Sequence, residues 1–528
     1  MFVSSLKIQN LKAFKDSGEF ALDRRMNIIT GHNNTGKSII LKALYTMQYL
    51  GVDPSDFRID SRFADIYITL DDVDEAALLR HFSIDYLIPT LEDDKHSLII
   101  KIQHTKSYQG NNIVGTGTNY NMLGIQGGAS VIPPNKGLQN IPRETPNNFI
   151  YPYFSKRKAT SFNKSIDRRI ATTVTESLND LVNKVDFLTL GNLPIQQEFR
   201  KLCSQILGFP LDVFPVEGGK SIGLSIDLYR NIPIEAMGDG VPHIVGLIAN
   251  LCMAQNQLFL IEEIENDIHP EALKNLLNLI IEKSETNQFV VTTHSDIVMR
   301  YLGAIPGSKI YQISLLPLDE ENIPTARWEL IGGSVKERRI LLDHLGYDLS
   351  DAWQWAGWLF LEESTAEMFI NHLLIPYFIP NLKYKLRTIS ADGNSQVEVK
   401  FNDFYRLFLF VHLSSIYESK AWVYLDNDDE GKKIAEALRE KFKTWNPDHF
   451  STFSKKSFEE YYPEYFHEGV ERVLALPHGQ NKQKEKGKLV ENVLKWAREN
   501  EGAAKEAIAK SAAEIIDILK RIEAVISR

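Results

Sequence analysis

A glycine-rich segment near the N-terminus constrains the fold of this chain more than any other feature. Residues 26–29 form an apolar run, residues 31–38 (GHNNTGKS) fit the pattern G-x-x-x-x-G-K-[ST], and an apolar helical pattern follows at 39–44. In the order strand, loop, helix, backbone N–H groups curl around phosphate oxygens and the helix N-terminus adds a favourable dipole. A chance glycine-rich turn would lack these flanks. The sequence therefore predicts a nucleoside triphosphate site.

The residues expected to contact the nucleotide are those of the loop and the first helical turn: Gly31, Asn33, Asn34, Thr35, Gly36, Lys37 and Ser38. Lys37 is expected to reach the β- and γ-phosphates, and Ser38 is expected to ligate Mg²⁺. The cofactors predicted from this segment are ATP and Mg²⁺, with Mn²⁺ as the alternative metal.

Composition limits the class of protein. A chain of 528 residues is too long for one ordinary core, so two or more domains are expected. Its 43% hydrophobic and 24% charged residues are typical of a soluble globular protein, and neither a run of membrane-span length nor a leader is apparent. Cys203 and Cys252 give no disulfide or zinc spacing, which favours a cytoplasmic protein without membrane contact. The net charge of −10 excludes a generally basic surface and leaves room for a local basic groove.

A second nucleotide motif follows more than 200 residues later. The apolar strand 258–261 ends in Glu262 and Glu263, of which the first is expected in the Mg²⁺ shell and the second at the attacking water. A further strand, 289–293, ends in His294, which at this spacing from the other two motifs is predicted to belong to the same site.

The motifs E-E-x-E-x-x-x-H-P at 262–270 and T-T-H-S at 292–295 resemble the ATPase of the OLD family (overcoming lysogenization defect). The resemblance covers roughly residues 1–345 and implies an ABC-type P-loop ATPase domain. Within this range, residues of about 107–148 are rich in Gly, Asn, Pro and Ser, which predicts a loop insertion. A helical lobe is expected at about 160–208, with amphipathic helices predicted at 173–190 and 194–207. It also implies that Gly238, in the candidate signature 236–240, faces the γ-phosphate of a partner subunit, so a homodimer or larger homo-oligomer is expected. Met237 stands where related sequences usually carry Ser, which predicts slow hydrolysis.

A second chemistry is predicted after residue 352. Strands at 358–361, 384–389 and 421–425 alternate with helices, a pattern that predicts a parallel sheet with functional groups at its strand ends. Glu362 follows the first of these strands, and Asp426 and Asp428 follow the third. Three clustered carboxylates repel each other without a cation, so a Mg²⁺ site is predicted. The alternative is a solvated acidic turn that caps the next helix.

The strand-end Glu and the D-x-D-x-x-G pattern at 426–431 resemble a Toprim nuclease domain, here at 352–528, and an ABC-type ATPase followed by Toprim is the OLD family layout. Glu363 stands where Toprim domains usually have Gly. The resemblance implies a further acidic ligand at Glu459, with Glu460 as second choice. Residues 482–488, with four lysines, are interpreted as a polar loop that either contacts a phosphodiester or is solvated. The tail, 502–527, is interpreted as a packing or oligomer-contact helix.

The expected fold is therefore α/β: an ABC-type P-loop ATPase domain followed by a Rossmann-like Toprim domain. The resemblance implies an ATP-regulated endonuclease acting on nucleic acid, with DNA favoured over RNA, in antiphage defence and with a protein partner encoded nearby. Two alternatives stay open. One is a non-nucleolytic ATP-dependent clamp or scaffold, and the other is a ribonuclease acting on tRNA.

Overall fold

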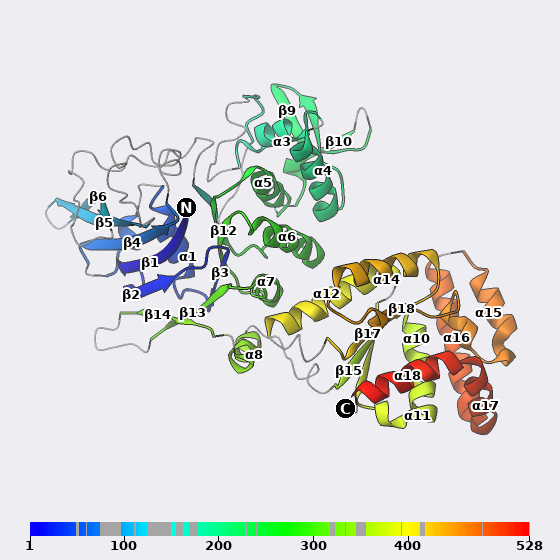
Figure 1. Ribbon diagram of the computed structural model, residues 1–528. Coiled ribbons are helices and arrows are strands. Elements are labelled where there is room, and N and C mark those ends of the chain that lie inside the picture. Colours follow the sequence, from blue (N-terminus) through cyan, green and yellow to red (C-terminus); the bar gives the residue numbers. More distant parts are fainter. Residues whose placement is uncertain are drawn as a thin grey trace. The chain divides into compact units, whose positions relative to one another are not determined.

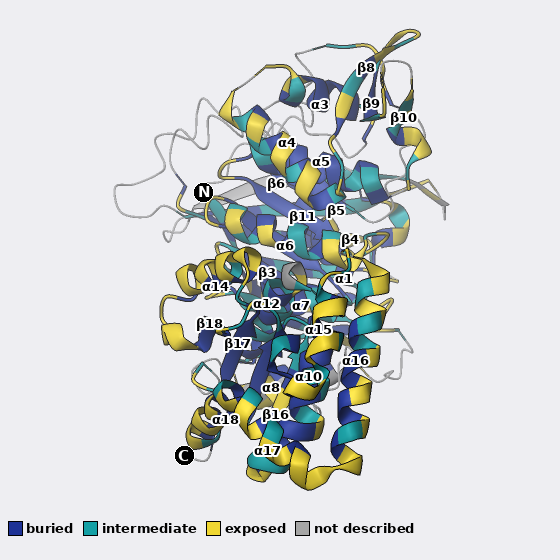
Figure 2. Ribbon diagram, turned by 90° about the vertical axis from the view of Figure 1, so that its right-hand side faces the viewer, coloured by how far each residue is buried: buried dark blue, intermediate teal, exposed yellow. Residues whose placement is uncertain are grey.

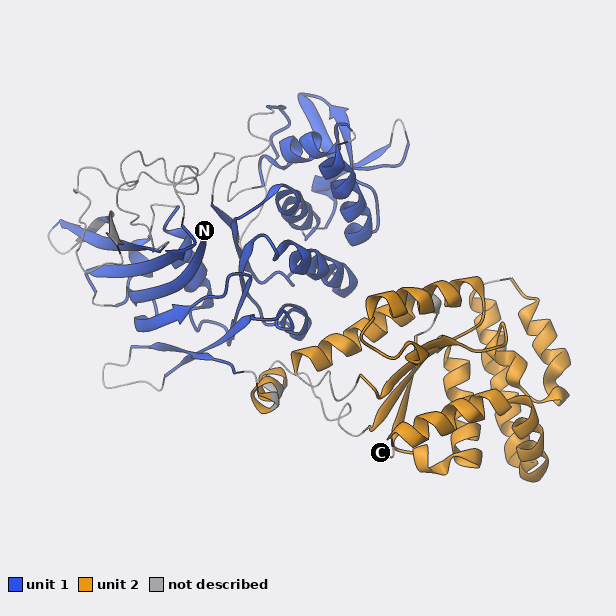
Figure 3. Cartoon of the chain, in the orientation of Figure 1, with its two compact units in different colours: residues 1–332 blue, residues 333–528 orange. Residues whose placement is uncertain are grey.

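A computed structural model of the chain describes most of its residues, and they divide into two compact units, Met1–Gly332 and Gly333–Arg528 (Figure 3). The described ranges are 1–48, 52–59, 61–73, 97–109, 112–124, 149–154, 162–167, 178–191, 193–227, 230–238, 240–316, 323–332, 334–344, 355–391, 393–411, 418–477 and 479–526. Each unit is considered by itself.

The first unit begins with a five-stranded antiparallel sheet of order β2-β1-β4-β5-β6. Its strands are β1 (Phe2–Leu11), β2 (Phe14–Ala21), β4 (Phe63–Asp71), β5 (Leu98–Gln109) and β6 (Asn112–Gly124). In β4, residues Ala64, Ile66 and Ile68 are fully buried, because successive side chains of a strand point to opposite faces and one face of this sheet covers the core.

The loop predicted at 107–148 is wrong for residues 107–109 and 112–124, which form the end of β5 and the whole of β6, an antiparallel pair. The remaining part of that prediction, 110–111 and 125–148, lies outside the described residues. The sequence signal was weak because apolar and polar residues do not alternate along residues 112–124. Its Thr118 instead places a hydroxyl 2.9 Å from the ring Nδ1 of His104, and backbone bonds to β5 hold the pair together.

A six-stranded sheet of order β14-β13-β3-β12-β11-β7 carries the glycine-rich loop, and it is parallel except for β14 (Figure 1). Its strands are β3 (Met26–Gly31), β7 (Ile150–Tyr153), β11 (Leu258–Glu262), β12 (Gln288–Thr292), β13 (Lys309–Leu315) and β14 (Ala326–Leu330). The central strands are continuous apolar runs because helices cover both faces, and Figure 2 shows them as buried.

The helix α1 (Lys37–Tyr45) packs between this sheet and the antiparallel one. On the opposite face lie α5 (Gly240–Met253), α6 (Pro270–Lys283) and α7 (Asp296–Leu302), side by side in Figure 1. Parallel strands place their carboxyl ends at one edge, so the loop after β3 and the residues after β11 and β12 share that edge.

The inserted lobe contains the helices α3 (Leu181–Thr189) and α4 (Pro194–Leu207), and the predicted helix at 194–207 is confirmed. Of the helix predicted at 173–190, residues 181–189 are helical, 178–180 are not, and 173–177 lie outside the described residues. It also contains a three-stranded antiparallel sheet of β8 (Asp212–Val216), β9 (Gly219–Ser225) and β10 (Asn231–Pro233), which the sequence analysis did not predict. These strands are short and mostly half-exposed, so they lack a strong apolar alternation.

The second unit is built on a fully parallel sheet of order β16-β15-β17-β18, as the alternating strands and helices predicted. Its strands are β15 (Gly357–Leu361), β16 (Leu386–Ser390), β17 (Ala421–Leu425) and β18 (Phe450–Thr452). Trp358 and Phe360 pack against phenylalanines of α12 (Asn394–Phe410), whereas Leu359 and Leu361 belong to a core on the other face. Successive residues of β15 therefore serve opposite helical layers.

The helices of the second unit surround this sheet. Besides α12 they are α8 (Val335–His344), α10 (Ser364–Phe369), a π-helical turn (Ile370–Leu374), α11 (Ile375–Phe378), α14 (Asp429–Lys441), α15 (His467–Leu474), α16 (Gln480–Glu499), α17 (Glu501–Ser511) and α18 (Ala513–Ile526). The predicted single tail helix is therefore two helices, α17 and α18.

The polar loop predicted at 482–488 is wrong, because these residues belong to α16. Lys486, Leu489, Val490 and Val493 are buried and recur at helical spacing, so α16 buries one narrow stripe. The many lysines and glutamates on its remaining surface made the apolar helical pattern difficult to recognise in the sequence.

None of the described helices combines the length and the apolar character needed to span a membrane.

Candidate functional site

The glycine-rich loop is shaped by two backbone positions that favour glycine. Gly31 has φ 147°, and a Cβ placed there would lie 2.2 Å from the carbonyl oxygen of Ile313 on the neighbouring β13. Gly36, with φ 102°, is the N-cap of α1. Glycine adopts such angles without a steric cost, and its missing side chain lets the backbone pass closely. The local sequence thus folds into a turn that directs the N-terminus of α1 toward the loop.

Lys37 lies in this loop with its ammonium group directed back at the backbone. Its Nζ donates to the carbonyl oxygens of Gly31, at 3.0 Å, and His32, at 2.9 Å. Burial lowers the pKa of Lys37, and the nearby carboxylates of Glu263 and Glu262 oppose that shift. A buried ammonium with only carbonyl partners fits a site that receives an anion, because phosphate oxygens would supply the missing negative charge.

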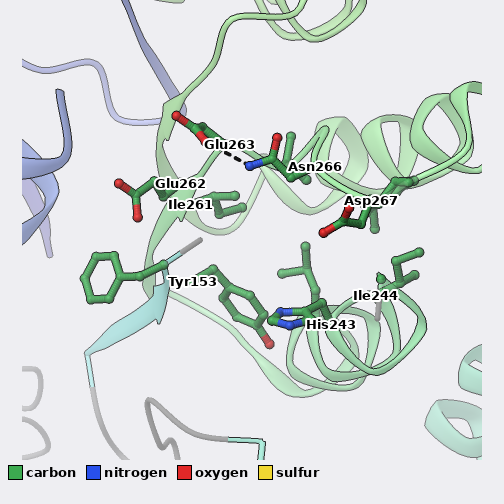
Figure 4. Close-up of a pocket in the computed structure, with 14 residues that line it drawn as sticks. Tyr153, His243, Ile244, Ile261, Glu262, Glu263, Asn266 and Asp267 are labelled. Atoms are coloured by element: carbon green, nitrogen blue, oxygen red, sulfur yellow. Dashed lines mark hydrogen bonds between the residues drawn. The ribbon is translucent and has the colours of Figure 1, made fainter. Parts of the chain in front are cut away.

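The strand ends bring the two acids to the same place. Thr292 pairs with Glu262 of β11 on one side and with Ile29 of β3 on the other. β12 therefore lies between the strand that leads into the two glutamates and the strand that leads into the glycine-rich loop. Glu263 leaves the strand with a left-handed φ of 48°, and its N–H donates to the carbonyl of Thr292. Asn266 Nδ2 donates to Glu263 Oε2 at 2.8 Å (Figure 4).

His294 completes this group from the end of β12. Its Nε2 is 3.8 Å from Glu263 Oε1 and is buried without a hydrogen-bond partner. Burial lowers the pKa of His294, Lys37 lowers it further, and Glu263 acts in the opposite direction. The structure therefore brings Lys37, Glu262, Glu263 and His294 into one electrostatic group, and the open Nε2 matches an additional polar ligand such as a phosphate oxygen.

Gly238 lies elsewhere. It borders a pocket of about 480 Å³ between the end of α4, the start of α5 and residues 267–269, and no residue of the glycine-rich loop lines that pocket. The neighbouring Gly240 passes so close to Asp267 that a Cβ would lie 2.2 Å from its carbonyl oxygen. Gly238 is thus not part of the group around Lys37 within one chain.

In the second unit, Glu362 and Asp426 meet at the ends of adjacent strands. β15 and β17 pair in parallel, with Leu361 opposite Tyr424, and Glu362 Oε2 accepts from the backbone N–H of Asp426 at 3.3 Å. Burial raises the pKa of Asp426 to about 9, with the negative charges of Glu362 and Glu459 adding to the shift. Burial likewise raises the pKa of Glu362 to about 7, and the charges of Glu363 and Asp428 add to it. The surroundings of this pair therefore disfavour the charged form of both acids.

Asp428 takes the helix-capping position that was the alternative interpretation of this acidic turn. Its Oδ1 accepts from the N–H of Gly431 at 2.7 Å, at the start of α14. Gly431 is required there because a Cβ would lie 2.2 Å from the carbonyl oxygen of Asp426.

The neighbouring Glu363 points into the opposite layer and forms a buried ionic cluster. Both of its carboxylate oxygens lie 2.8 Å from Lys486 Nζ, and Glu459 Oε2 lies 3.1 Å from the same atom. Burial alone would lower the pKa of Lys486, but Glu459 and Glu363 outweigh burial and raise it. Lys486 is thus a counter-ion that two acids share beside the Glu362–Asp426 pair.

Two other acids near this region have local structural partners. Glu460 Oε1 accepts from the N–H of Ser457 in a capping box, whereas Glu459 is the acid that points into the buried cluster. Glu367 joins α10 to β16, because its oxygens accept from Thr388 and from the N–H of Ser390.

Among the residues that the structure describes, no three His, Cys, Asp or Glu side chains are arranged as a ready-made metal site. The donor chemistry of Glu362, Asp426 and Asp428 nevertheless fits a hard divalent cation, which prefers carboxylate oxygens. Burial and, after it, repulsion by neighbouring acids raise the pKa values of Glu362 and Asp426, and a bound cation would offset both effects.

Comparisons with known proteins support the assignment of the first unit. Residues 1–118 match the family described as "AAA ATPase domain", and residues 135–300 match "AAA domain, putative AbiEii toxin, Type IV TA system". An "ATP/GTP phosphatase" of Helicobacter pylori is 22% identical over 355 residues, which cover 61% of this chain and 93% of that protein.

Solved structures of SMC heads are also similar. A head bound to the C-winged helix domain of ScpA has 16% identity and a TM-score of 0.43, and covers 62% of this chain and 98% of its own. A head with an extended coiled coil bound to the C-terminal domain of ScpA, derived from Pyrococcus furiosus, has 15% identity and a TM-score of 0.41, with coverage of 65% and 99%. Scores below 0.5 add nothing to the assignment.

The family matches and the phosphate-loop geometry together define the first unit as an ATPase domain of the AAA/ABC type. ATP is the nucleotide expected in such a domain. Two residues of these sites were not predicted as site residues from the sequence. Lys486 was included only in a lysine-rich segment, and Glu265 was only one letter of the E-E-x-E motif.

Proposed function

We propose that this chain is an ATP-binding, metal-dependent endonuclease of the OLD family, in which the ATPase domain regulates a Toprim phosphodiesterase in the second unit. The observation that carries the proposal is the meeting of Glu362 and Asp426 at adjacent strand ends of a parallel sheet. Their pKa values are raised by burial and by neighbouring negative charge. Acids with perturbed pKa values at such strand ends are typical of functional sites.

Mg²⁺ or Mn²⁺ would be held by Glu362, Asp426 and Asp428, with Glu459 as a further acid. When bound, the ion would activate water and stabilise the leaving oxygen of a phosphodiester. The protein's own contribution is the arrangement of the acids: the β15–β17 pairing brings Glu362 to Asp426, and Lys486 supplies a counter-ion that Glu363 and Glu459 share nearby.

In the ATPase domain, Lys37 would bind the β- and γ-phosphates and Ser38 and Glu262 the Mg²⁺ ion, with Glu263 at the attacking water and His294 at the γ-phosphate. Gly238 would meet the nucleotide of a second copy of the chain, which is consistent with its place at a pocket that no residue of its own chain's glycine-rich loop lines. The functional unit is therefore a homodimer or a larger homo-oligomer.

The proposed substrate is nucleic acid, with DNA favoured over RNA, and the proposed role is antiphage defence with a protein partner encoded nearby. These steps rest on resemblance to the OLD family. A second candidate, an ATP-dependent clamp with a non-catalytic second unit, is favoured by one observation: Lys486 already neutralises Glu363, the residue that replaces the usual Gly.

Nicking of supercoiled plasmid with Mg²⁺ or Mn²⁺ separates the two candidates. We expect Glu362→Gln and Asp426→Asn to lower nicking by several orders of magnitude, with unchanged ATP binding and equal or slightly higher melting temperatures without metal. Asp429→Asn, an exposed acid in the first turn of α14, is the matched control and should nick like the parent.

If the parent protein cuts and both acid variants cut equally well, the assigned metal site is wrong. If the parent cuts neither plasmid, single-stranded DNA nor tRNA, with or without ATP, the clamp is the better description. Cleavage of tRNA alone would identify a ribonuclease.

A further inference from the structure

The third acid of the E-E-x-E motif has a role that the motif alone does not assign. We infer that Glu265 is a positioning residue that holds His294 in place opposite Glu263. This inference rests on the ATPase part of the proposed function, in which His294 contacts the γ-phosphate.

Glu265 connects two strand ends of the parallel sheet. It follows β11, and its Oε1 accepts from the backbone N–H of His294 at 2.7 Å and from Thr293 Oγ1 at 2.8 Å, both just after β12. Thr293 Oγ1 in turn accepts from the N–H of Ser295 at 2.9 Å, and Ser295 is the N-cap of α7. One carboxylate oxygen thus organises the whole turn from which His294 projects.

The position of His294 depends on this turn. Its imidazole Nε2 has no hydrogen-bond partner and is 3.8 Å from Glu263 Oε1, so no side-chain contact of that atom fixes the ring. Among the described contacts, the hydrogen bond from the backbone N–H of His294 to Glu265 is therefore the polar contact that fixes the position from which the imidazole side chain extends. A displacement of about 1 Å in a reacting group lowers a rate by on the order of 100-fold.

Glu265 is an unusual residue for a purely structural role. Its Oε2 is buried without a hydrogen-bond partner, and desolvation of a carboxylate costs free energy that an apolar or amide side chain would not incur. A carboxylate does accept two donors on one oxygen more strongly than a neutral group does. The arrangement is explained if strong alignment of the His294 turn is what the site requires.

The test is a double-mutant cycle on ATP hydrolysis by the full-length chain, with Glu265→Ala, His294→Ala and the double variant. We expect Glu265→Ala to lower kcat by about 10- to 100-fold with less than a twofold change in KM for ATP. In the His294→Ala background, Glu265→Ala should have no further effect, because it acts through His294. Glu265→Gln, whose amide oxygen can accept the same two bonds more weakly, should have a kcat between those of Glu265→Ala and the parent.

Two further variants keep the inference falsifiable. Glu265→Asp keeps the charge and shortens the reach, so it should lower kcat as Glu265→Ala does. Glu271→Ala removes an exposed acid from the first turn of α6 and should hydrolyse ATP like the parent. Melting curves of all variants exclude a general loss of structure.

If the losses of Glu265→Ala and His294→Ala multiply, or if Glu265→Ala behaves like Glu271→Ala, the inference is wrong while the proposed site stands. If His294→Ala hydrolyses ATP at the parent rate, the assignment of His294 fails and the inference falls with it.

Discussion

Replacing Lys486 by Met should strongly destabilise the second unit. Lys486 is 6% exposed and lies within about 3 Å of two carboxylates, of which Glu459 is fully buried. At an effective dielectric constant of about 20, each contact at this separation is worth about 5 kcal/mol of Coulomb energy, which desolvation of the ions largely offsets. Removing the cation forfeits the attraction and leaves the desolvated acids behind.

The expected loss in the free energy of unfolding is therefore about 3–5 kcal/mol, the range for breaking a buried pair from one side. In a unit of this size, that corresponds to a fall of about 6–20 °C in melting temperature. The measurement is thermal and urea denaturation followed by circular dichroism in EDTA, so that no metal replaces the missing charge.

The same helix offers a matched control. Lys488 lies two residues further along α16, pairs with Glu485 at 2.6 Å and is mostly exposed, so Lys488→Met should change the free energy of unfolding by less than about 1 kcal/mol. Adding Glu459→Gln to Lys486→Met should restore much of the stability, because the uncompensated buried charge disappears. Equal melting curves for Lys486→Met and Lys488→Met would refute the reasoning.

Three further predictions concern the first unit. Lys37→Ala should abolish ATP binding in a calorimeter, because the cation for the β- and γ-phosphates is lost, and tight binding by this variant would contradict the assignment. ATP turnover by the parent should be slow, about a few per minute or less against a median near 10 s⁻¹, because Met237 has no hydroxyl for a phosphate, and many turnovers per second would show that the signature lies elsewhere. Burial lowers the pKa of His104 to about 4, so the unfolded chain binds a proton below about pH 6.5 that the folded chain does not. The free energy of unfolding should therefore fall as the pH is lowered from 6.5 to 4. In urea titrations over that range, the free energy of unfolding of His104→Gln should fall by up to about 3 kcal/mol less than that of the parent.

The nucleotide site was largely predictable because its parts are local. A strand, a loop with two conformationally demanding glycines and a helix follow each other within residues 26–45, and each later motif ends a strand of continuous apolar residues. Parallel pairing then brings the strand ends to one edge without further information from the sequence. The group formed by Lys37, Glu263 and His294 follows from these rules.

The second unit shows where local rules stop. The acids Glu362 and Asp426 were predicted from strand ends, but the partner of Glu363 comes from a helix 123 residues further along the chain. Nothing near Lys486 in the sequence distinguishes it from the other lysines of its segment, since only the packing of α16 decides which of them is buried.

The sequence by itself determined the phosphate loop, the apolar strands that carry the later motifs and the acids at the ends of those strands, because each depends on neighbours along the chain. The tertiary structure alone decided that residues 112–124 form a strand, that Lys486 is a buried counter-ion, and that Glu265 bonds to the turn at His294. These features depend on backbone pairing, helix packing and side-chain bonds between segments far apart in the sequence. These contacts stabilise the protein only after folding has brought the distant segments together.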